Sequence, residues 1–353
     1  MRTKIHDVAR SARVSPTTVS RAFVRPALLR ADTLERVLAA AKALDYHPNR
    51  AASSLSTGKT GNIGIVVPDL SNPFYPAIVR GAQLRAHQAG YAVLLVDSDE
   101  DPDAESSLTH TLAKQADGVI VCAPFASDSQ LRRLAQKTAI VLVNRRLGGV
   151  AAVLMDVAHG MRQAVSHLHA LGHRRCAYLG GPRASWSNRE RLRGLHAGIR
   201  AKGMTLLEFG PFEPKFDGGL EGAERVIGSG VTAVIAYNDL MALGVLSHFA
   251  SSGVCVPGEI SVVGFDDLLF ASMSAPPLTT VSMPMEAAGR AAVELLLARL
   301  TGDDGGAVNA TPSDLELATQ LIARGTTAPP PAISSFAGCG AREGAAISRT
   351  PAE

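Results

Sequence analysis

The sequence predicts a small all-α head, a short hinge, and an α/β core of two lobes with parallel sheets. Two observations predict this fold. Residues 1–45 have the apolar spacing of amphipathic helices, whereas beyond Gly61 short apolar segments alternate with helices of about 12–16 residues. Such alternation is typical of parallel sheets joined by crossover helices. The chain of 353 residues is long enough for two or three units.

The head is expected to hold three helices. Residues 5–12 place apolar side chains at the i, i+3, i+4 spacing of one helix face, and residues 32–44 do the same. Between them, Pro16 suits the first turn of a second helix, with Ser15 as its N-cap. Pro48 pushes the residue before it out of helical geometry, so the head ends at about residue 47.

The second helix carries more hydroxyl groups than packing needs. If it begins at Pro16, then Val19 and Phe23 face the bundle. The polar side chains Thr17, Thr18 and Arg21 then lie on the outward side, with Ser20 toward one flank. An arginine fork can bind the O6/N7 edge of guanine, and hydroxyls can bind phosphates or base edges. This face therefore predicts contact with DNA.

Charge is divided unevenly along the chain. Residues 1–60 hold eleven Lys and Arg against four Asp and Glu, so their net charge is +7 and that of the remainder is −4. A basic lobe favours phosphate backbones as partners. The alternative is a solvated charged surface.

The core is expected to contain two series of strands with helices between most of them. The predicted strands are 62–68, 91–97, 117–123, 139–144 and 151–156 in the first series, and 174–181, 206–210, 233–238, 261–267 and 279–284 in the second. Two similar series suggest two lobes with a cleft between them. In such sheets ligands bind beyond the carboxyl ends of the strands.

Several segments together resemble one known family. "DVARSARVSPTTVSRAF" resembles the DNA-binding head of the LacI/GalR (lactose and galactose repressor) family, and "LDYHPNRAASSLSTGKTGNIGIVVPDLSNPF" resembles its hinge and first core strand. The stretches "LGHRRCAYLGGP", "NRERLRGL", "AYNDLMALGVL", "VPGEISVVGFDD" and "PPLTTVSMP" continue the resemblance, in the same order, to about residue 325.

The resemblance implies a helix-turn-helix head at 1–47, a hinge helix and linker at 48–60, and a periplasmic-binding-protein-like core for effector binding and dimerisation at 61–325. It implies a transcriptional repressor of sugar or nucleoside catabolism genes, acting in the cytoplasm at the nucleoid. The expected partners are a near-palindromic double-stranded operator, a second copy of the chain, and a sugar, sugar phosphate or nucleoside. Residues 326–353 are rich in Pro, Gly, Ala and Ser and predict a disordered tail.

The hinge "PNRAASSLS" is too short to form a stable helix alone. The resemblance implies that it folds on DNA, where two copies pair and Leu55 enters the minor groove as a wedge. Asn49, Arg50 and Ala52 are the other hinge residues expected at the DNA. The alternative is a plain linker with a chance leucine.

Candidate effector residues follow the predicted strand ends. The resemblance assigns Arg191 to the effector. The remaining candidates are Asp69, Asn72, Phe74, Arg146, Trp186, Asn238 and Asp266. Carboxylate, guanidinium and amide groups suit the paired hydroxyls of a polyol. Alternatives are open for three of them: Asp69 and Asn72 as helix caps, and Trp186 as an ordinary core residue rather than a platform for a sugar ring or base.

Other classes of protein fit less well. A solute-binding protein of a transporter shares the core fold, but a signal peptide and no basic head are expected of it. An enzyme is not expected, because no catalytic set or phosphate-binding motif is found. The four cysteines lie far apart without metal spacing, so reduced thiols and no cofactor are expected. No apolar run approaches the length of a membrane span.

Overall fold

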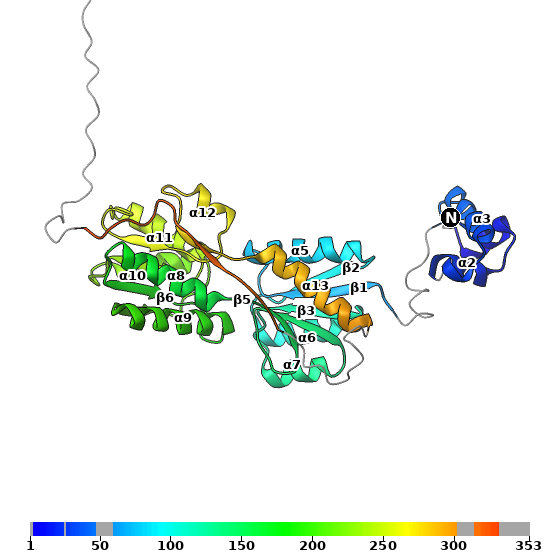
Figure 1. The fold of residues 1–353 in the computed structure, drawn as a ribbon, viewed down its shortest axis with the longest axis horizontal. Coiled ribbons are helices and arrows are strands. Elements are labelled where there is room, and N and C mark those ends of the chain that lie inside the picture. Colours follow the sequence, from blue (N-terminus) through cyan, green and yellow to red (C-terminus); the bar gives the residue numbers. More distant parts are fainter. Residues whose placement is uncertain (1–2, 25, 47–58, 302–313, 332–353) are drawn as a thin grey trace, which may run out of the picture.

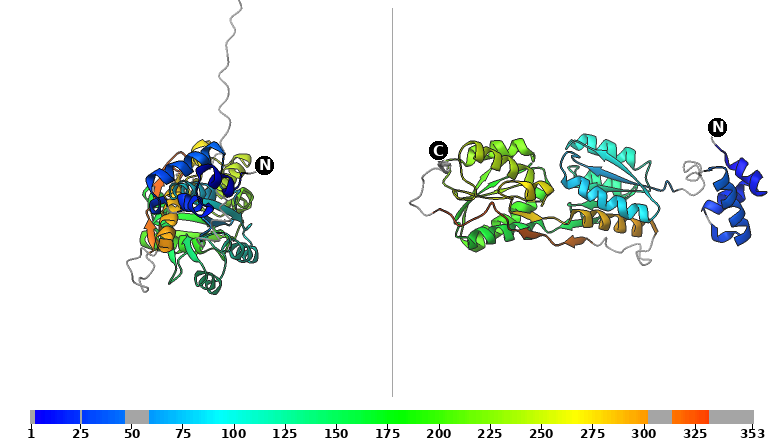
Figure 2. Two further views of the ribbon diagram at one scale, coloured as in Figure 1. Left: turned by 90° about the vertical axis from the view of Figure 1, so that its right-hand side faces the viewer. Right: turned by 90° about the horizontal axis from the view of Figure 1, so that it is seen from above.

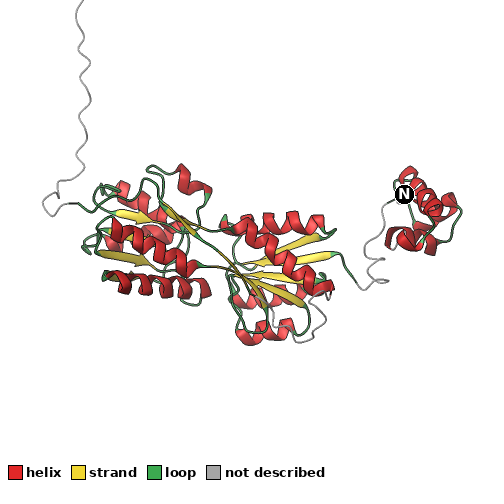
Figure 3. Ribbon diagram, viewed as in Figure 1, coloured by secondary structure: helices red, strands yellow, loops and turns green. Residues whose placement is uncertain are grey.

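The structure is a computed structural model that describes residues 3–24, 26–46, 59–301 and 314–331. Figure 1 shows the helical head and the two-lobed core, and Figure 3 shows that helices and strands alternate through both lobes. The head holds α1 (Ile5–Ala12), α2 (Pro16–Val24), a short 3₁₀ turn (Pro26–Leu28) and α3 (Ala31–Ala43). One buried valine from each helix, Val8, Val19 and Val37, joins the small core of the head.

The first lobe is built on a parallel sheet. The described strands run in the order β11-β5-β4-β3-β1-β2, with every pairing parallel. The strands are β1 (Asn62–Val67), β2 (Ala92–Asp97), β3 (Gly118–Cys122), β4 (Ala139–Val143), β5 (Ala151–Met155) and β11 (Leu315–Leu317). The helices are α5 (Phe74–Gln88), α6 (Pro102–Leu112), α7 (Asp128–Ala135) and α13 (Met285–Thr301).

The second lobe repeats this plan with a smaller sheet in the order β7-β6-β8-β9. Its strands are β6 (Arg175–Leu179), β7 (Thr205–Phe209), β8 (Ala233–Ala236) and β9 (Ser261–Val263). Its helices are α8 (Val157–Ala170), α9 (Trp186–Lys202), α10 (Phe216–Val226), α11 (Asp239–Ser251) and α12 (Leu269–Met273). The view from above in Figure 2 shows helices on both faces of each sheet.

The chain passes between the lobes at three places in its described part. These are the steps from β5 to α8, from β10 (Thr280–Ser282) to α13, and from β11 to β12 (Gln320–Ile322). Strands β10 and β12 pair antiparallel beside the crossing. The hydroxyl of Thr319 donates to the carbonyl oxygen of Asp156 at 2.8 Å, so two of the crossing segments are tied together.

Helix α13 returns to the first lobe because it can pack closely on α5, its neighbour in Figure 1. A Cβ atom at Gly81 would collide with the carbonyl of Glu286, and one at Gly289 would collide with the carbonyl of Ile78. Glycine at these two positions lets the helix backbones touch. The late segment 285–301 therefore completes the first lobe.

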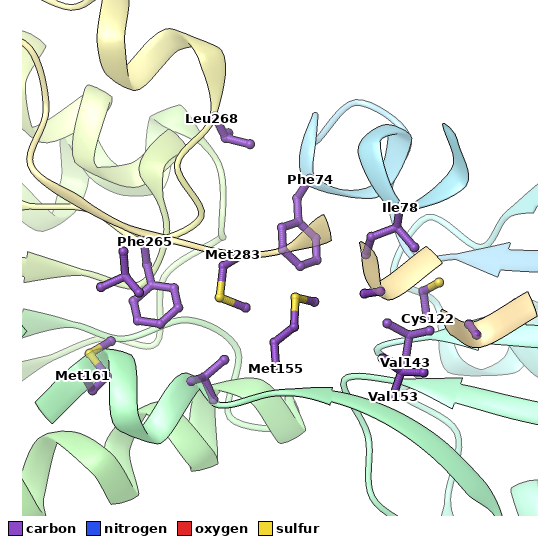
Figure 4. Close-up of a cluster of buried hydrophobic side chains, with 14 of the residues drawn as sticks. Phe74, Ile78, Cys122, Val143, Val153, Met155, Met161, Phe265, Leu268 and Met283 are labelled. Atoms are coloured by element: carbon purple, nitrogen blue, oxygen red, sulfur yellow. The ribbon is translucent and has the colours of Figure 1, made fainter. Parts of the chain in front are cut away.

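A continuous apolar cluster joins the two lobes (Figure 4). Phe74 lies on the side of the first lobe and Phe265 on that of the second, with Met155 and Met283 between them. Methionine side chains are flexible and adapt to changes in packing. The junction is thus filled by residues that tolerate movement of one lobe against the other.

Each of the ten predicted strands is present, although the strand expected at 261–267 is limited to Ser261–Val263. The strands β11 and β12 were not predicted.

The prediction that a disordered tail begins at residue 326 needs correction. Thr326 is fully buried, its hydroxyl donates to the carbonyl oxygen of Val262 at 2.6 Å, and residues up to 331 lie along the second lobe.

Candidate functional site

Helix α2 presents the polar face predicted from the sequence. The Ser15 hydroxyl accepts a hydrogen bond from the Thr18 amide at 3.1 Å and caps the helix. Val19 is fully buried, whereas Thr17 and Arg21 are exposed. Pro16, Thr18 and Ser20 are half-buried. The arginine and one threonine of the predicted face are therefore at the surface of the head.

The predicted hinge contacts lie outside the described residues. Asn49, Arg50, Ala52 and Leu55 belong to this segment, and their roles stay predictions.

A polar pocket lies between the lobes, where the carboxyl ends of strands from both sheets meet. Its empty volume is about 510 Å³, part of it open to solvent. Five of the eight predicted effector residues line it: Asn72, Phe74, Arg191, Asn238 and Asp266. The other lining residues are Tyr75, Glu100, Ala123, Phe125, Asn144, Pro182, Ser185, Ser187, Pro214 and Tyr237.

A buried ion pair forms one wall of this pocket. A terminal guanidinium nitrogen of Arg191 lies 3.1 Å from a carboxylate oxygen of Asp266, and the two side chains are 5% and 4% exposed. The guanidinium carbon lies 4.3 Å from the ring centres of both Tyr237 and Phe265, an arrangement that favours a cation. Burial raises the pKa of Asp266 well above its ordinary value, against the opposing effect of the Arg191 charge.

Arg191 retains an unused donor. Its Nε is buried and has no hydrogen-bond partner among the described residues. A buried donor without a partner costs about 1–3 kcal/mol. Because Arg191 lines the pocket, an acceptor on a bound molecule that reaches this nitrogen would remove the cost.

Asp266 also connects the pocket to the crossing between the lobes. Its φ of 126° is unusual for a residue other than glycine, and such backbone strain is concentrated at functional sites. The Asp266 amide donates to the carbonyl oxygen of Val281 at 2.9 Å, on strand β10 just before the chain enters α13. A change at Asp266 can therefore be transmitted to a crossing segment.

Two predicted amides hold the local backbone as well as lining the pocket. Asn238 caps α11 by accepting from the Met241 amide at 2.9 Å, and its own amide donates to the carbonyl oxygen of Pro214 at 2.8 Å. Asn72 accepts from the Phe74 amide at 3.1 Å at the start of α5. Asn72 therefore lines the pocket as expected and bonds the first amide of α5, whereas the N-cap of that helix is Pro73.

Three predicted residues do not line the pocket. Asp69 accepts from the Ser71 amide at 2.7 Å in a local turn, and it does not cap α5 either, because that helix begins at Phe74. Arg146 is exposed and pairs with Asp314 at 2.9 Å, so it ties the end of β4 to the start of β11. Trp186, at the start of α9 in the second lobe, packs against an apolar cluster of the first lobe. The alternative of apolar packing thus describes its position.

Sequence reasoning missed Tyr75, Glu100, Phe125, Asn144 and Tyr237. Two of them carried a usable signal, since Asn144 ends the strand predicted at 139–144 and Glu100 follows the strand predicted at 91–97.

Within the described residues, no group of three or more His, Cys, Asp and Glu side chains is placed to hold a metal ion. No helix in the described ranges is long and apolar enough to span a membrane.

The head and the pocket together define a class of protein, namely a DNA-binding regulator with a small-molecule pocket in a separate core. Residues 4–49 match the model of bacterial regulatory proteins of the lacI family, and residues 165–327 match a periplasmic binding protein-like domain. The HTH-type transcriptional regulator GalS of Salmonella typhimurium is 35% identical over 84% of this chain and 90% of its own length. The HTH-type transcriptional regulator DegA of Bacillus subtilis is 30% identical over 82% and 89%.

Comparison with solved structures indicates the same class of protein. The lac repressor dimer bound to operator and the anti-inducer ONPF superposes with a TM-score of 0.81 at 29% identity, covering 93% of this chain and all of that one. A complex of the regulator CelR with cellobiose gives a TM-score of 0.68 at 31% identity, covering 92% of this chain and all of that one. The chain belongs to the LacI family of bacterial regulatory proteins. It is a ligand-responsive DNA-binding transcriptional regulator and not an enzyme.

Proposed function

We propose that this regulator represses sugar or nucleoside catabolism genes and responds to a sugar, sugar phosphate or nucleoside bound between its lobes. It acts in the cytoplasm at the nucleoid, where its operator is. One observation carries the effector site: the buried pair of Arg191 and Asp266 leaves an unpartnered donor at the wall of a polar pocket. The ring of Tyr237, which lines the pocket, suits the apolar face of a sugar or base.

The head reads DNA through α2. In this proposal Arg21 and Thr17 contact base edges in the major groove, while Thr18 and Ser20 hold phosphates. The exposure of Arg21 and Thr17, with Val19 buried behind them, supports the assignment.

The operator is bound by a homodimer formed through the core. Large apolar side chains are exposed on both lobes, namely Leu84 on α5, Leu95 on the edge strand β2, and Leu269, Phe270 and Met273 on α12. Figure 1 places these elements on the same side of the core. Apolar surface of this kind favours a protein contact. Light scattering should give a dimer, and a stable tetramer would contradict this arrangement.

The effector controls DNA binding by moving one lobe against the other. Rotation about the crossing segments separates the two hinges of a dimer and removes the pairing that Leu55 needs. Coupling of this kind is typically about 1–3 kcal/mol, or about 5–150-fold in operator affinity. The substitution Leu55→Ala should weaken operator binding and leave the affinity of the core for its effector nearly intact.

The decisive experiment measures binding of Arg21→Ala to DNA selected from a random pool by the parent protein. Fluorescence anisotropy should show a loss of about 1–3 kcal/mol on this DNA and relaxed preference at one base pair. The control is Arg225→Ala, which alters an exposed arginine on α10 in the core. An unchanged ratio of selected to random DNA in Arg21→Ala would overturn the assignment of α2.

A further inference from the structure

The pocket between the lobes carries more negative than positive charge. Among its described lining residues, the charged side chains are Glu100, Arg191 and Asp266. Arg191 and Asp266 contact each other at 3.1 Å, so the positive charge of one offsets the negative charge of the other. Glu100 is the charged lining residue that is not part of this pair.

The loop that presents Glu100 is held firmly in place. The Glu100 amide donates to the carbonyl oxygen of Pro68 at 2.8 Å. The carboxylate of Asp97 accepts from the amides of Leu70 and Asp99 at 2.8 and 3.0 Å. These bonds fix the turn that follows β2 and so fix the position of Glu100.

Holding Glu100 there strains the backbone. Asp99 and Glu100 are consecutive residues in the left-handed region, with φ of 50° and 56°. This conformation is uncommon for residues with a side chain, and strain of this kind is retained where function requires a position. The strain therefore points to a role for the Glu100 side chain in the pocket.

The carboxylate of Glu100 accepts no hydrogen bond from the residues that the structure describes. Lys215, just before α10 in the second lobe, attracts it, whereas Asp69, Asp99 and Glu213 add negative charge around it. Burial raises the pKa of Glu100. A hydroxyl or N–H donor on a bound molecule would satisfy this carboxylate, because a carboxylate accepts hydrogen bonds only.

We propose that Glu100 determines the charge selectivity of the pocket, so that the effector is a polyhydroxylated molecule without a phosphate group. This inference rests on the proposed function of the same pocket. A phosphate monoester carries about −1.5 to −2 charges at neutral pH. Near a carboxylate in a partly buried site, we expect it to bind about 10- to 100-fold more weakly than its unphosphorylated parent.

The test uses the purified full chain and matched pairs of compounds in thermal-shift and calorimetric titrations. The pairs are ribose with ribose 5-phosphate, glucose with glucose 6-phosphate, fructose with fructose 1-phosphate, and adenosine with adenosine monophosphate. At least one parent compound should bind, and its phosphate ester should bind at least about tenfold more weakly. A phosphate ester that binds more tightly than its parent compound would overturn the proposal.

Variants separate the role of Glu100 from general effects. Glu100→Gln keeps the size of the side chain and removes its charge, so the preference against phosphate esters should fall by about tenfold. Glu224→Gln, an exposed glutamate on α10 that does not line the pocket, is the matched control and should keep the parent ratio. An unchanged ratio in Glu100→Gln refutes the role of Glu100 while leaving the effector site intact. Absence of binding by every compound counts against the pocket itself, and the inference fails with it.

Discussion

The buried pair of Arg191 and Asp266 gives a prediction that can be worked from the structure. The substitution Asp266→Asn removes the negative charge and keeps the shape of the side chain. The change therefore leaves the Arg191 guanidinium in place without a charged partner.

The expected loss is large because neither group is solvated. With the two side chains 5% and 4% exposed, water cannot replace the missing charge. Removing one partner of a buried pair costs about 3–5 kcal/mol. Since the asparagine oxygen can still accept a hydrogen bond from Arg191, we expect the lower end of this range, about 3 kcal/mol.

Urea unfolding followed by far-ultraviolet circular dichroism measures this loss. The matched control is Asp267→Asn, since Asp267 pairs with Arg324 at 2.6 Å but the side chains are 20% and 23% exposed. Because water reaches this pair more easily, its loss should cost less than the loss of the Arg191–Asp266 pair. The double variant Arg191→Met/Asp266→Asn removes both charges and should regain part of the stability that Asp266→Asn loses.

The reasoning would be refuted if Asp266→Asn lost no more stability than Asp267→Asn. Such a result would mean that Asp266 does not carry the charge that balances Arg191. Its carboxyl would then be protonated in the free protein, in the direction that burial shifts its pKa.

Three further predictions concern the second lobe and its junction with the first. Burial lowers the pKa values of His167 and His173 below the ordinary 6.5, so these side chains take up protons on unfolding at acidic pH. The free energy of unfolding should therefore fall as the pH drops below about 6.5. In urea titrations, His173→Gln should flatten this dependence on pH. Deletion of residues 326–353 should lower the melting temperature because it removes the buried Thr326, whereas deletion of residues 332–353 should leave it unchanged. Equal melting temperatures for the two shortened proteins would contradict this. The single tryptophan, Trp186, belongs to the second lobe and packs against the first. An effector that opens the lobes should therefore shift its fluorescence to longer wavelength. An unchanged spectrum would mean that the contact of Trp186 with the first lobe is kept when the effector binds.

Local sequence patterns predicted most elements of this protein. Helix and strand periodicity depend on neighbouring residues, so the helices of the head and the ten strands were found from the sequence. The outward face of α2 followed from counting along one helix from Pro16, and Thr17 and Arg21 are exposed as predicted. The strands β11 and β12 were missed because they are only three residues long and depend on pairing with β5 and β10.

Only some of the residues that line the pocket were predicted from the sequence, and the reason is physical. Strand ends indicated Asn72, Asn238 and Asp266, because all parallel strands of a sheet end at one edge. The same rule does not tell which side chain near a strand end enters the cleft. Arg146 instead meets Asp314, a residue far away in the sequence, and is held at the surface.

Sequence alone thus determined the class of elements, their order and the outward polar face of α2, since each rests on contacts within one helix or strand. Tertiary structure decided which charges share the pocket and that Thr326 is buried against the second lobe. Glu100 and Arg191 come together only because the chain crosses between two lobes, and Thr326 is buried only because residues 326–328 lie along strand β9. Long-range packing of this kind leaves no periodic pattern in the sequence.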